Sequence, residues 1–173
     1  CLLSSKPMLY ACNLKEEEIA DPKSNYNFES FRKWAEQQQN AECCAISAKM
    51  EEELSEIEEE EALEYLDAMG VDDSGVASLI KGSYDLLGLA SYLTAGEKET
   101  RAWTFTKGMT APQCAGLIHT DFEKSFIKAE VVSYEDLMAA GSMQAARESG
   151  KLRLEGKEYI FSDGDVALFK CNA

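Results

Sequence analysis

The sequence predicts an α/β segment followed by an α+β domain, and three observations support this fold class. Two short apolar runs flank a helical pattern near the start of the chain, as in a parallel strand, helix, strand unit. The charge is uneven, because residues 1–90 carry 7 basic and 20 acidic side chains whereas residues 91–173 carry 10 and 12. The second part also consists of short alternating runs and compact turns. We therefore expect two domains, residues 1–90 and residues 91–173.

The first unit is expected to open with a strand, a helix and a second strand. Residues 8–12 form a short apolar strand, and a polar loop follows from Asn13. Asn27 is expected to cap the helix. Residues 43–47 give the second strand, so the two strands should pair in parallel through a right-handed crossover. The side chains expected on the inner face of the helix are Phe28, Phe31, Trp34 and Ala35.

An acidic helical stretch follows. Nine glutamates occupy the fourteen positions from Glu51 to Glu64, and the apolar spacing slips register within this run. We predict two helices, or one sharply bent helix, ending at Gly70 as a carboxy-terminal cap. Consecutive glutamates fan around a helix, so a solvated acidic face is expected, and a metal site or a site for a cationic partner is the alternative.

A further helix is predicted over residues 74–89, and its expected inward residues are Val76, Leu79, Ile80, Tyr84 and Leu87.

The second unit begins with an alternating strand over residues 101–106. Residues 110–113, Thr-Ala-Pro-Gln, form a capping box that opens a helix. A strand over residues 126–132 leads into another helix at Ser133, with Leu137 and Met138 expected at its centre.

Near the end of the chain, an Asp163-Gly164 turn between residues 159–161 and 166–169 predicts a β-hairpin. Helices on one face of a small mixed sheet fit an α+β domain of about 75 residues. We expect a ubiquitin-like β-grasp fold.

Composition narrows the possible classes of protein. The six cysteines include no C-x-x-C pair and only one histidine is present, so structural zinc is not expected and the cysteines are interpreted as reduced, mostly packed thiols. The apolar runs are too short to cross a membrane and no leader pattern opens the chain, which favours a cytoplasmic protein without a membrane partner. The acidic first unit would repel a phosphate backbone, and no DNA partner is expected. Because the chain opens at Cys1 within an apolar segment, it is interpreted as a fragment of a longer protein.

The residues after the two predicted strands suggest recognition of a nucleotide base. No phosphate-binding loop of the G-x-x-x-x-G-K-[ST] type is present. Asn13 at a strand end, however, offers a donor and an acceptor to the edge of a purine, and Glu16 accepts hydrogen bonds from ring amino or imino groups. Residues 47–49, Ser-Ala-Lys, follow the second strand and are expected to wall the base with backbone amides.

Four blocks of this sequence resemble the carboxy-terminal half of the YchF, or Obg-like ATPase, family, and the resemblance covers essentially the whole chain. These blocks are residues 6–16, 93–103, 111–123 and 150–166. The resemblance implies a Rossmann-like P-loop NTPase segment followed by a TGS domain of β-grasp fold. In this family N-x-x-E replaces the guanine-selecting N-K-x-D and ATP binds at least as well as GTP. The residues implied to bind the nucleotide are Asn13, Leu14, Glu16, Ser47 and Ala48.

The resemblance also implies what lies elsewhere. The phosphate loop, the switch regions, the magnesium ligands and the catalytic residue belong to the segment before Cys1, so no catalytic residue is expected within these 173 residues. The TGS domain is implied to dock on the ribosome, through rRNA or ribosomal proteins. Cys114, where Ala is usual, and Ser125, where Gly is usual, depart from the family pattern.

Two further features leave alternatives open. His119 lies beside Asp121 and Glu123, and a structural or partner-contact role is favoured over acid/base catalysis. A set of basic side chains could form an RNA-binding stripe next to Arg101 and Trp103, or belong to an ordinary mixed surface. This set is Lys124, Lys128, Arg147, Lys151, Arg153 and Lys157. The alternative to an ATPase fragment is a stand-alone RNA- or protein-binding β-grasp module without nucleotide activity.

Overall fold

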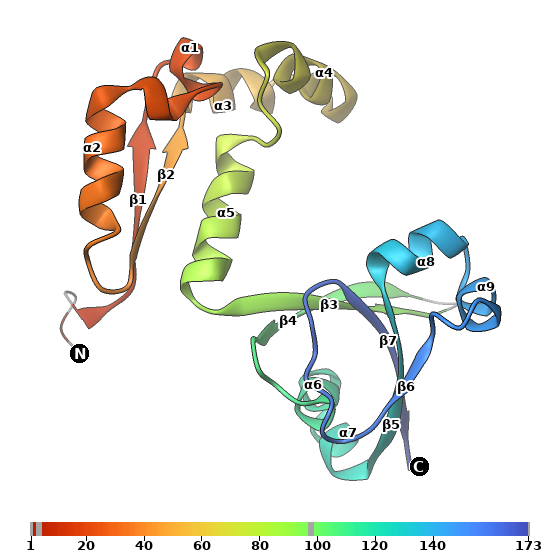
Figure 1. The fold of residues 1–173 in the computed structure, drawn as a ribbon. Coiled ribbons are helices and arrows are strands. Elements are labelled where there is room, and N and C mark those ends of the chain that lie inside the picture. The colour runs from red at the N-terminus through yellow and green to blue at the C-terminus, as the bar shows by residue number, and fades with distance from the viewer. Residues whose placement is uncertain (1, 3–4, 97–98, 173) are drawn as a thin grey trace. The chain divides into compact units, whose positions relative to one another are not determined.

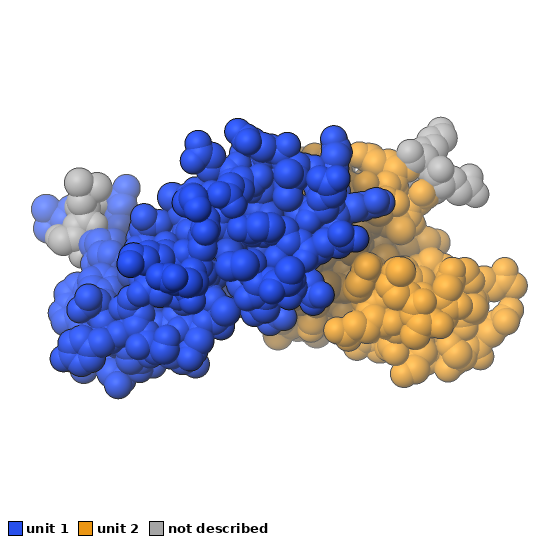
Figure 2. Space-filling view, turned by 90° about the horizontal axis from the view of Figure 1, so that it is seen from above, with its two compact units in different colours: residues 1–87 blue, residues 88–173 orange. Residues whose placement is uncertain are grey.

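The computed structural model describes residue 2 and residues 5–96 and 99–172 (Figure 1). The chain divides into two compact units, residues 1–87 and residues 88–173, which are coloured separately in Figure 2. The division falls three residues before the expected boundary. Leu89 and Ala90 are the first residues of a strand of the second unit and not the end of a helix.

A two-stranded parallel sheet is the centre of the first unit. Strands β1 (Met8–Asn13) and β2 (Ala41–Ile46) pair in the expected direction, with Asn13 opposite Ile46. The last residues of both strands therefore lie side by side at one end of the sheet, which is where loops from parallel strands meet.

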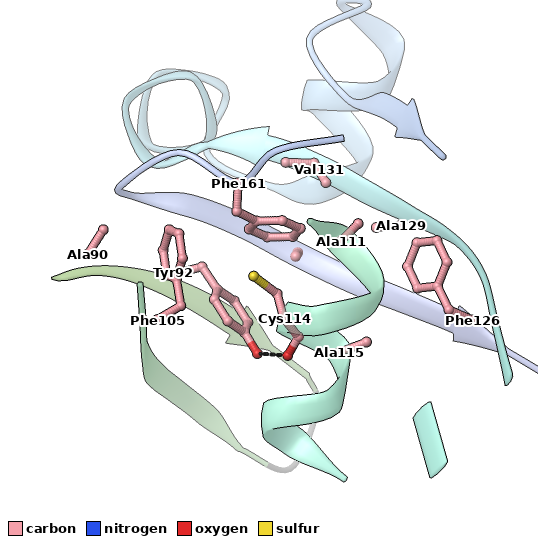
Figure 3. Packing of buried hydrophobic residues seen from close by; sticks show 11 residues of the cluster. Ala90, Tyr92, Phe105, Ala111, Cys114, Ala115, Phe126, Ala129, Val131 and Phe161 are labelled. Carbon is pink, nitrogen blue, oxygen red and sulfur yellow. Dashed lines mark hydrogen bonds between the residues drawn. The ribbon is translucent and has the colours of Figure 1, made fainter. Parts of the chain in front are cut away.

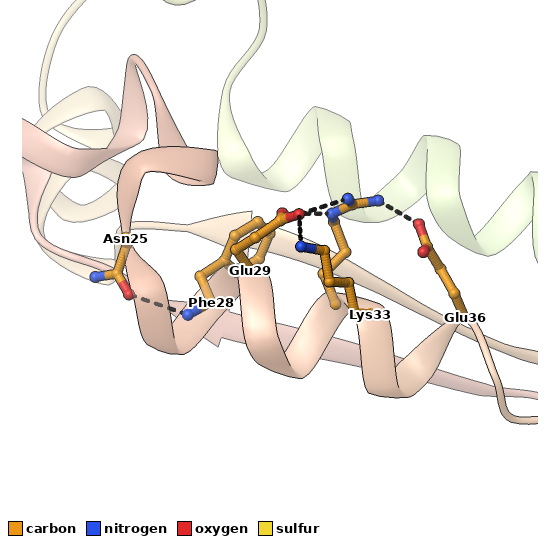
Figure 4. Close-up of polar contacts among 6 residues, drawn as sticks. Asn25, Phe28, Glu29, Lys33 and Glu36 are labelled. Carbon is orange, nitrogen blue, oxygen red and sulfur yellow. Dashed lines mark hydrogen bonds and ion pairs between the residues drawn. The ribbon is translucent and has the colours of Figure 1, made fainter.

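Helix α2 (Tyr26–Ala35) packs on one face of this sheet. The Tyr10 ring of β1 contacts Phe31 edge-on, with ring centroids 5.2 Å apart. The predicted cap is wrong, since Asn25 and not Asn27 caps the helix, its side chain accepting a 3.0 Å hydrogen bond from the Phe28 N–H (Figure 4). Asn27 lies inside the first turn, because the helix begins two residues earlier than expected.

Helix α2 carries an ion-pair network (Figure 4). The Arg32 guanidinium donates hydrogen bonds to Glu29 at 2.8 and 2.9 Å and also contacts Glu36. These hydrogen bonds lower the pKa of the Glu29 carboxyl to about 2.

Trp34, expected on the inner face of α2, is 45 % exposed.

The acidic stretch forms two helices, as predicted. Helix α3 (Ala48–Ser55) is followed by α4 (Glu59–Met69), and Gly70 closes α4 in the left-handed conformation with φ +70°. The Tyr65 hydroxyl of α4 donates a 3.0 Å hydrogen bond to Glu53 of α3 and joins the two helices. Two short helical segments, α1 (Glu16–Ile19) and η2 (Pro22–Ser24), precede α2.

Helix α5 (Gly75–Leu86) covers the other face of the sheet, and its predicted inner face is partly wrong. The contact is made by glycines, because a Cβ on Gly75 would lie 3.0 Å from Ile46 and one on Gly82 would lie 3.4 Å from Leu9. Small residues let the helix approach the strands closely. Val76, Ile80 and Leu87 are consequently exposed rather than buried.

A five-stranded mixed sheet in the order β4-β3-β7-β5-β6 forms the second unit. Its strands are β3 (Leu89–Ala95), β4 (Thr100–Thr106), β5 (Phe126–Ser133), β6 (Arg153–Glu155) and β7 (Asp165–Cys171). The central pair β3 and β7 is parallel and the other pairs are antiparallel.

Helix α6 (Ala111–Ile118) packs on one face of this sheet over the main core (Figure 3). The predicted capping box is present, with Gln113 accepting a 2.8 Å hydrogen bond from the Thr110 N–H. The fully buried Tyr92 is polar only at its hydroxyl, which donates a 2.8 Å hydrogen bond to the Cys114 carbonyl (Figure 3). A short helix, α7 (Thr120–Ser125), follows α6.

The opposite face is covered in part by α8 (Tyr134–Ala140) and α9 (Met143–Glu148). Ser133 caps α8 as expected, and Leu137 packs against the buried Val132 and Val166. Met138, also expected at the centre, is exposed.

The predicted terminal hairpin does not form, although its turn does. Gly164 adopts φ +76° as an Asp-Gly turn requires. Ile160 bridges to Thr110, whereas β7 pairs with β3 and β5. The two apolar runs thus belong to different parts of the unit.

Candidate nucleotide-base site

A pocket of about 510 Å³ opens at the carboxyl ends of β1 and β2. It is lined by the last residue of β1, by residues that follow the two strands and by one residue of α4. The lining residues are Asn13, Leu14, Lys15, Glu16, Glu17, Ser47, Lys49 and Met69. Crevices outside the carboxyl ends of parallel strands are the usual ligand sites of open α/β sheets.

Asn13 joins the two loops that form the pocket. Its side-chain Oδ1 accepts a 2.9 Å hydrogen bond from the Ala48 N–H, and the Leu14 N–H donates to the Ile46 carbonyl at 2.8 Å. Among the described residues, none accepts a hydrogen bond from the Asn13 Nδ2. The side-chain orientation is therefore set by the backbone, and the amide donor remains available to a ligand.

Ser47 fixes the second loop at the start of α3. It is 3 % exposed and is the N-cap of α3, where its hydroxyl faces the Met50 N–H. The first turn of α3 is fixed further by Glu51, whose Oε1 accepts a 2.6 Å hydrogen bond from the Gly75 N–H at the start of α5.

Two acidic residues line the pocket, and Glu16 is the less exposed of them, with 25 % of its side chain exposed against 79 % for Glu17. Lys49 Nζ lies 3.0 Å from its Oε1 and 3.2 Å from its Oε2, and only the Oε2 contact has the geometry of a hydrogen bond. Oε1 is buried without a hydrogen-bond donor among the described residues. The same ion pair raises the pKa of the Lys49 ammonium above its usual range. A buried carboxylate oxygen that lacks a donor is suited to accept one from a ligand.

The structure brings together most of the residues expected at this site. Asn13, Leu14, Glu16 and Ser47 line the pocket, whereas Ala48 does not, because its N–H is bonded to Asn13. Met69 was not expected. It comes from α4, twenty residues after the second loop, and no local sequence signal places it at the pocket.

Outside the pocket, the sequence raised three further questions, which concern a metal site, a catalytic role of His119 and a membrane-spanning helix. Within residues 5–96 and 99–172, no group of three or more His, Cys, Asp or Glu side chains is placed to hold a metal ion. His119 Nδ1 accepts a hydrogen bond from the Asp121 N–H and caps α7, a structural role. None of the helices that the structure describes is long and apolar enough to cross a membrane.

The expected basic stripe of the second unit is partly neutralised. Arg147 pairs with Glu130 at 2.9 Å, and Lys151 pairs with Asp136 at 3.1 Å. Arg153 lies 3.5 Å from the buried Asp165. Half of the six cations are therefore bound to carboxylates of the same unit.

Comparison with known proteins gives the family. Residues 89–172 match the family model YchF-GTPase_C, described as a protein of unknown function (DUF933). The chain is 56 % identical over 171 residues to a protein named ribosome-binding ATPase YchF in Bacillus subtilis (strain 168), covering 99 % of this chain and 46 % of that protein. It is 42 % identical to Obg-like ATPase 1 of Pongo abelii, covering 98 % of this chain and 43 % of that protein.

Solved structures agree with this result. The Schizosaccharomyces pombe YchF GTPase superposes with a TM-score of 0.78 at 37 % identity, over 96 % of this chain and 44 % of that one. A GTP-binding protein from Pyrococcus horikoshii OT3 shares the fold with a TM-score of 0.61 at 22 % identity, over 96 % of this chain and 46 % of that one. The chain spans about half the length of the curated relatives it matches. It belongs to the YchF/Obg-like ATPase family and corresponds to the carboxy-terminal part of its longer members.

Proposed function

We propose that residues 1–87 supply the base-binding side of a nucleoside triphosphate site in a YchF-type ATPase. The observation that carries this proposal is the Asn13 side chain, which is oriented by the Ala48 N–H at a pocket of about 510 Å³, large enough to hold a nucleotide base. With Oδ1 occupied, Nδ2 is the group that meets a ligand. A purine N7, which is an acceptor in adenine and guanine alike, is the partner that fits it.

The remaining contacts are assigned from the same geometry. Leu14 and Met69 supply the apolar surface for the faces of the ring. Glu16 Oε1 accepts from the amino group on the base edge, and the ion pair with Lys49 holds this carboxylate in place. Binding of ATP at least as well as GTP follows from the family resemblance carried by Asn13 and Glu16.

Phosphate binding and hydrolysis are not assigned to this chain. Magnesium, which the family implies, finds no set of ligands among the described residues. We assign the activity to the longer protein, in which a phosphate loop and magnesium ligands would complete the site.

We further propose that residues 88–172 are a TGS domain of β-grasp fold. The sheet order, with a parallel central pair and a helix crossing one face, supports this assignment. Several relatives are named ribosome-binding ATPase, and docking of this domain on the ribosome in the cytoplasm is the matching role. The Arg101 guanidinium, 4.2 Å from the centroid of the Trp103 ring, offers a flat cationic surface for an RNA base.

Nucleotide titration with an isotope-labelled chain tests the base site. ATP and GTP added separately should shift the backbone amide signals of Leu14 and Lys49, with the larger shifts for ATP. Glu16→Asp should reduce the ATP preference, because the shorter side chain withdraws the carboxylate from the base edge. Glu60→Asp, outside the pocket, is the matched control. A titration of the longer protein, where the gene encodes residues before Cys1, should give the same preference at higher affinity.

The alternative is a stand-alone RNA- or protein-binding module without nucleotide activity. It would be favoured if no amide signal around Asn13 responded to either nucleotide in any form of the protein. Co-sedimentation with ribosomes tests the docking role independently. Arg101→Ala should weaken co-sedimentation, whereas Lys81→Ala, at an exposed position of the first unit, should not, and equal losses would count against the proposed contact.

A further inference from the structure

A second cavity in the first unit shares no residue with the base pocket. This acidic groove has a volume of about 440 Å³ and lies between α3, α4 and α5. Its lining residues are Glu51, Leu54, Ser55, Glu59, Ala62, Leu63, Leu66, Asp72, Asp73, Ser74, Val76 and Ala77.

The floor of the acidic groove is apolar and accessible. Leu63 is 61 % exposed and Val76 is 52 % exposed, while Leu66 is buried beneath them. Val76 faces away from the sheet because α5 uses Gly75 and Gly82 for its contact with the strands. An apolar floor that the fold does not cover is typical of a surface that binds a partner.

The rim of the acidic groove is negatively charged. Four carboxylates line it, and none of the described lining residues is basic. The shape of the groove is held by hydrogen bonds on two sides, from the Gly75 N–H to Glu51 and from the Tyr65 hydroxyl to Glu53. Of the four carboxylates, Glu51 is thus fixed by a backbone N–H, and the contact between Glu53 and Tyr65 joins the two helices that form the walls of the groove.

We propose that the acidic groove binds a basic amphipathic segment of a protein partner. Leucine-type side chains of such a helix would contact Leu63 and Val76. The stems of lysine or arginine would lie along the apolar edge, with their charged ends on Glu59 and Asp72. Nucleic acid is disfavoured because its phosphates would meet four carboxylates. This site is independent of the proposed nucleotide function.

The test uses synthetic helical peptides and the full 173-residue chain. A fluorescent peptide that forms an amphipathic helix, with leucine on one face and lysine on the other, is titrated with the chain and followed by anisotropy. The same peptide with glutamate in place of lysine is the control. The basic peptide should bind at 1:1 stoichiometry and weaken several-fold between about 0.05 and 0.3 M salt, because exposed ion pairs are screened. The acidic peptide should not bind.

Paired variants locate the binding site. Leu63→Ser with Val76→Ser should weaken binding about tenfold, which corresponds to about 1.4 kcal/mol. Ile80→Ser is the matched control, since this residue of α5 is equally exposed and does not line the groove. The double variant Glu59→Gln/Asp72→Asn should weaken binding. The double variant Glu60→Gln/Glu64→Gln removes the same number of negative charges outside the groove and should not weaken it.

Full affinity of the variant with Leu63→Ser and Val76→Ser would overturn the proposal. Three other outcomes would also overturn it. Equal losses in the two charge pairs would show attraction to the overall negative charge and not a site. Loss of binding with Ile80→Ser alone would place the peptide elsewhere on α5. Self-association of the chain that Leu63→Ser abolishes, measured by sedimentation, would make a second copy the occupant.

Discussion

The Asn13 side chain accepts a 2.9 Å hydrogen bond from the Ala48 N–H, which lies 35 positions further along the chain. This bond joins the loops after two parallel strands at the point where both strands end. It also takes the acceptor of the amide and leaves the donor. One residue therefore has a structural role through Oδ1 and, in the proposed function, a binding role through Nδ2.

Two substitutions at Asn13 should separate these roles. Asn13→Ala removes the acceptor and should lower the free energy of unfolding by about 1 kcal/mol, the usual net contribution of a hydrogen bond. Asn13→Asp retains an acceptor oxygen and loses the donor. It should unfold at a urea concentration close to that of the parent and yet lose the nucleotide response. Urea unfolding and ATP titration of the same samples provide the measurement. Full ATP binding by Asn13→Asp would refute the assigned donor.

The two glycines of α5 that face the sheet should respond differently to alanine. A Cβ at Gly75 would lie 3.0 Å from both Glu51 Oε1 and Ile46 Cβ, so Gly75→Ala should destabilise the protein by about 1–3 kcal/mol through overpacking. At Gly82 the nearest atom is 3.4 Å away, which is ordinary contact. Gly82→Ala should be neutral or stabilising by up to about 1 kcal/mol, because alanine has the higher helix propensity. Equal urea midpoints for the two variants would contradict this difference.

Local patterns in the sequence predict the first sheet and much of the base site. Short apolar runs indicate both strands, and the spacing of Asn13 and Glu16 at the end of the first strand places them at one pocket. Met69 could not be predicted in this way. Its position at the pocket depends on the direction that α4 takes after the break that follows α3.

Long-range pairing explains the main errors in the second unit. The run that becomes β3 continues the apolar helical pattern of α5, and only its pairing with β4 and β7 makes it a strand. The terminal hairpin is predicted from an Asp-Gly turn that does form. Ile160 nevertheless bridges to Thr110, a partner 50 positions away that turn chemistry does not specify.

Cys114 should resist alkylation in the folded protein. It is a fully buried residue of α6 in the main core, and this burial raises the pKa of its thiol to about 12. Because the thiolate is the reactive form, almost none is present at about pH 8. Iodoacetamide followed by peptide mass spectrometry should find the half-buried Cys171 modified well before Cys114, and both modified at equal rates in urea. Equal rates without urea would contradict the burial.

Tyr159 should contribute to loss of stability at alkaline pH. Burial, together with the 2.7 Å hydrogen bond that its hydroxyl donates to Asp165, raises the pKa of this phenol from 10 to about 12. The folded protein therefore holds the proton more tightly than the unfolded chain does. The stabilisation is complete below pH 10 and is lost as the pH rises from about 10 to 12.

Tyr159→Phe tests this relationship between one phenol and one buried carboxylate. At about pH 7 the variant should lose about 1–3 kcal/mol, because the buried Asp165 side chain loses a hydrogen-bond donor. Its free energy of unfolding should fall less steeply than that of the parent between about pH 10 and 12, because one titrating group has been removed. Tyr134→Phe is the control, since Tyr134 is exposed. Parallel stability curves for the parent and Tyr159→Phe across this range would show that the Tyr159 proton is not held by the folded state.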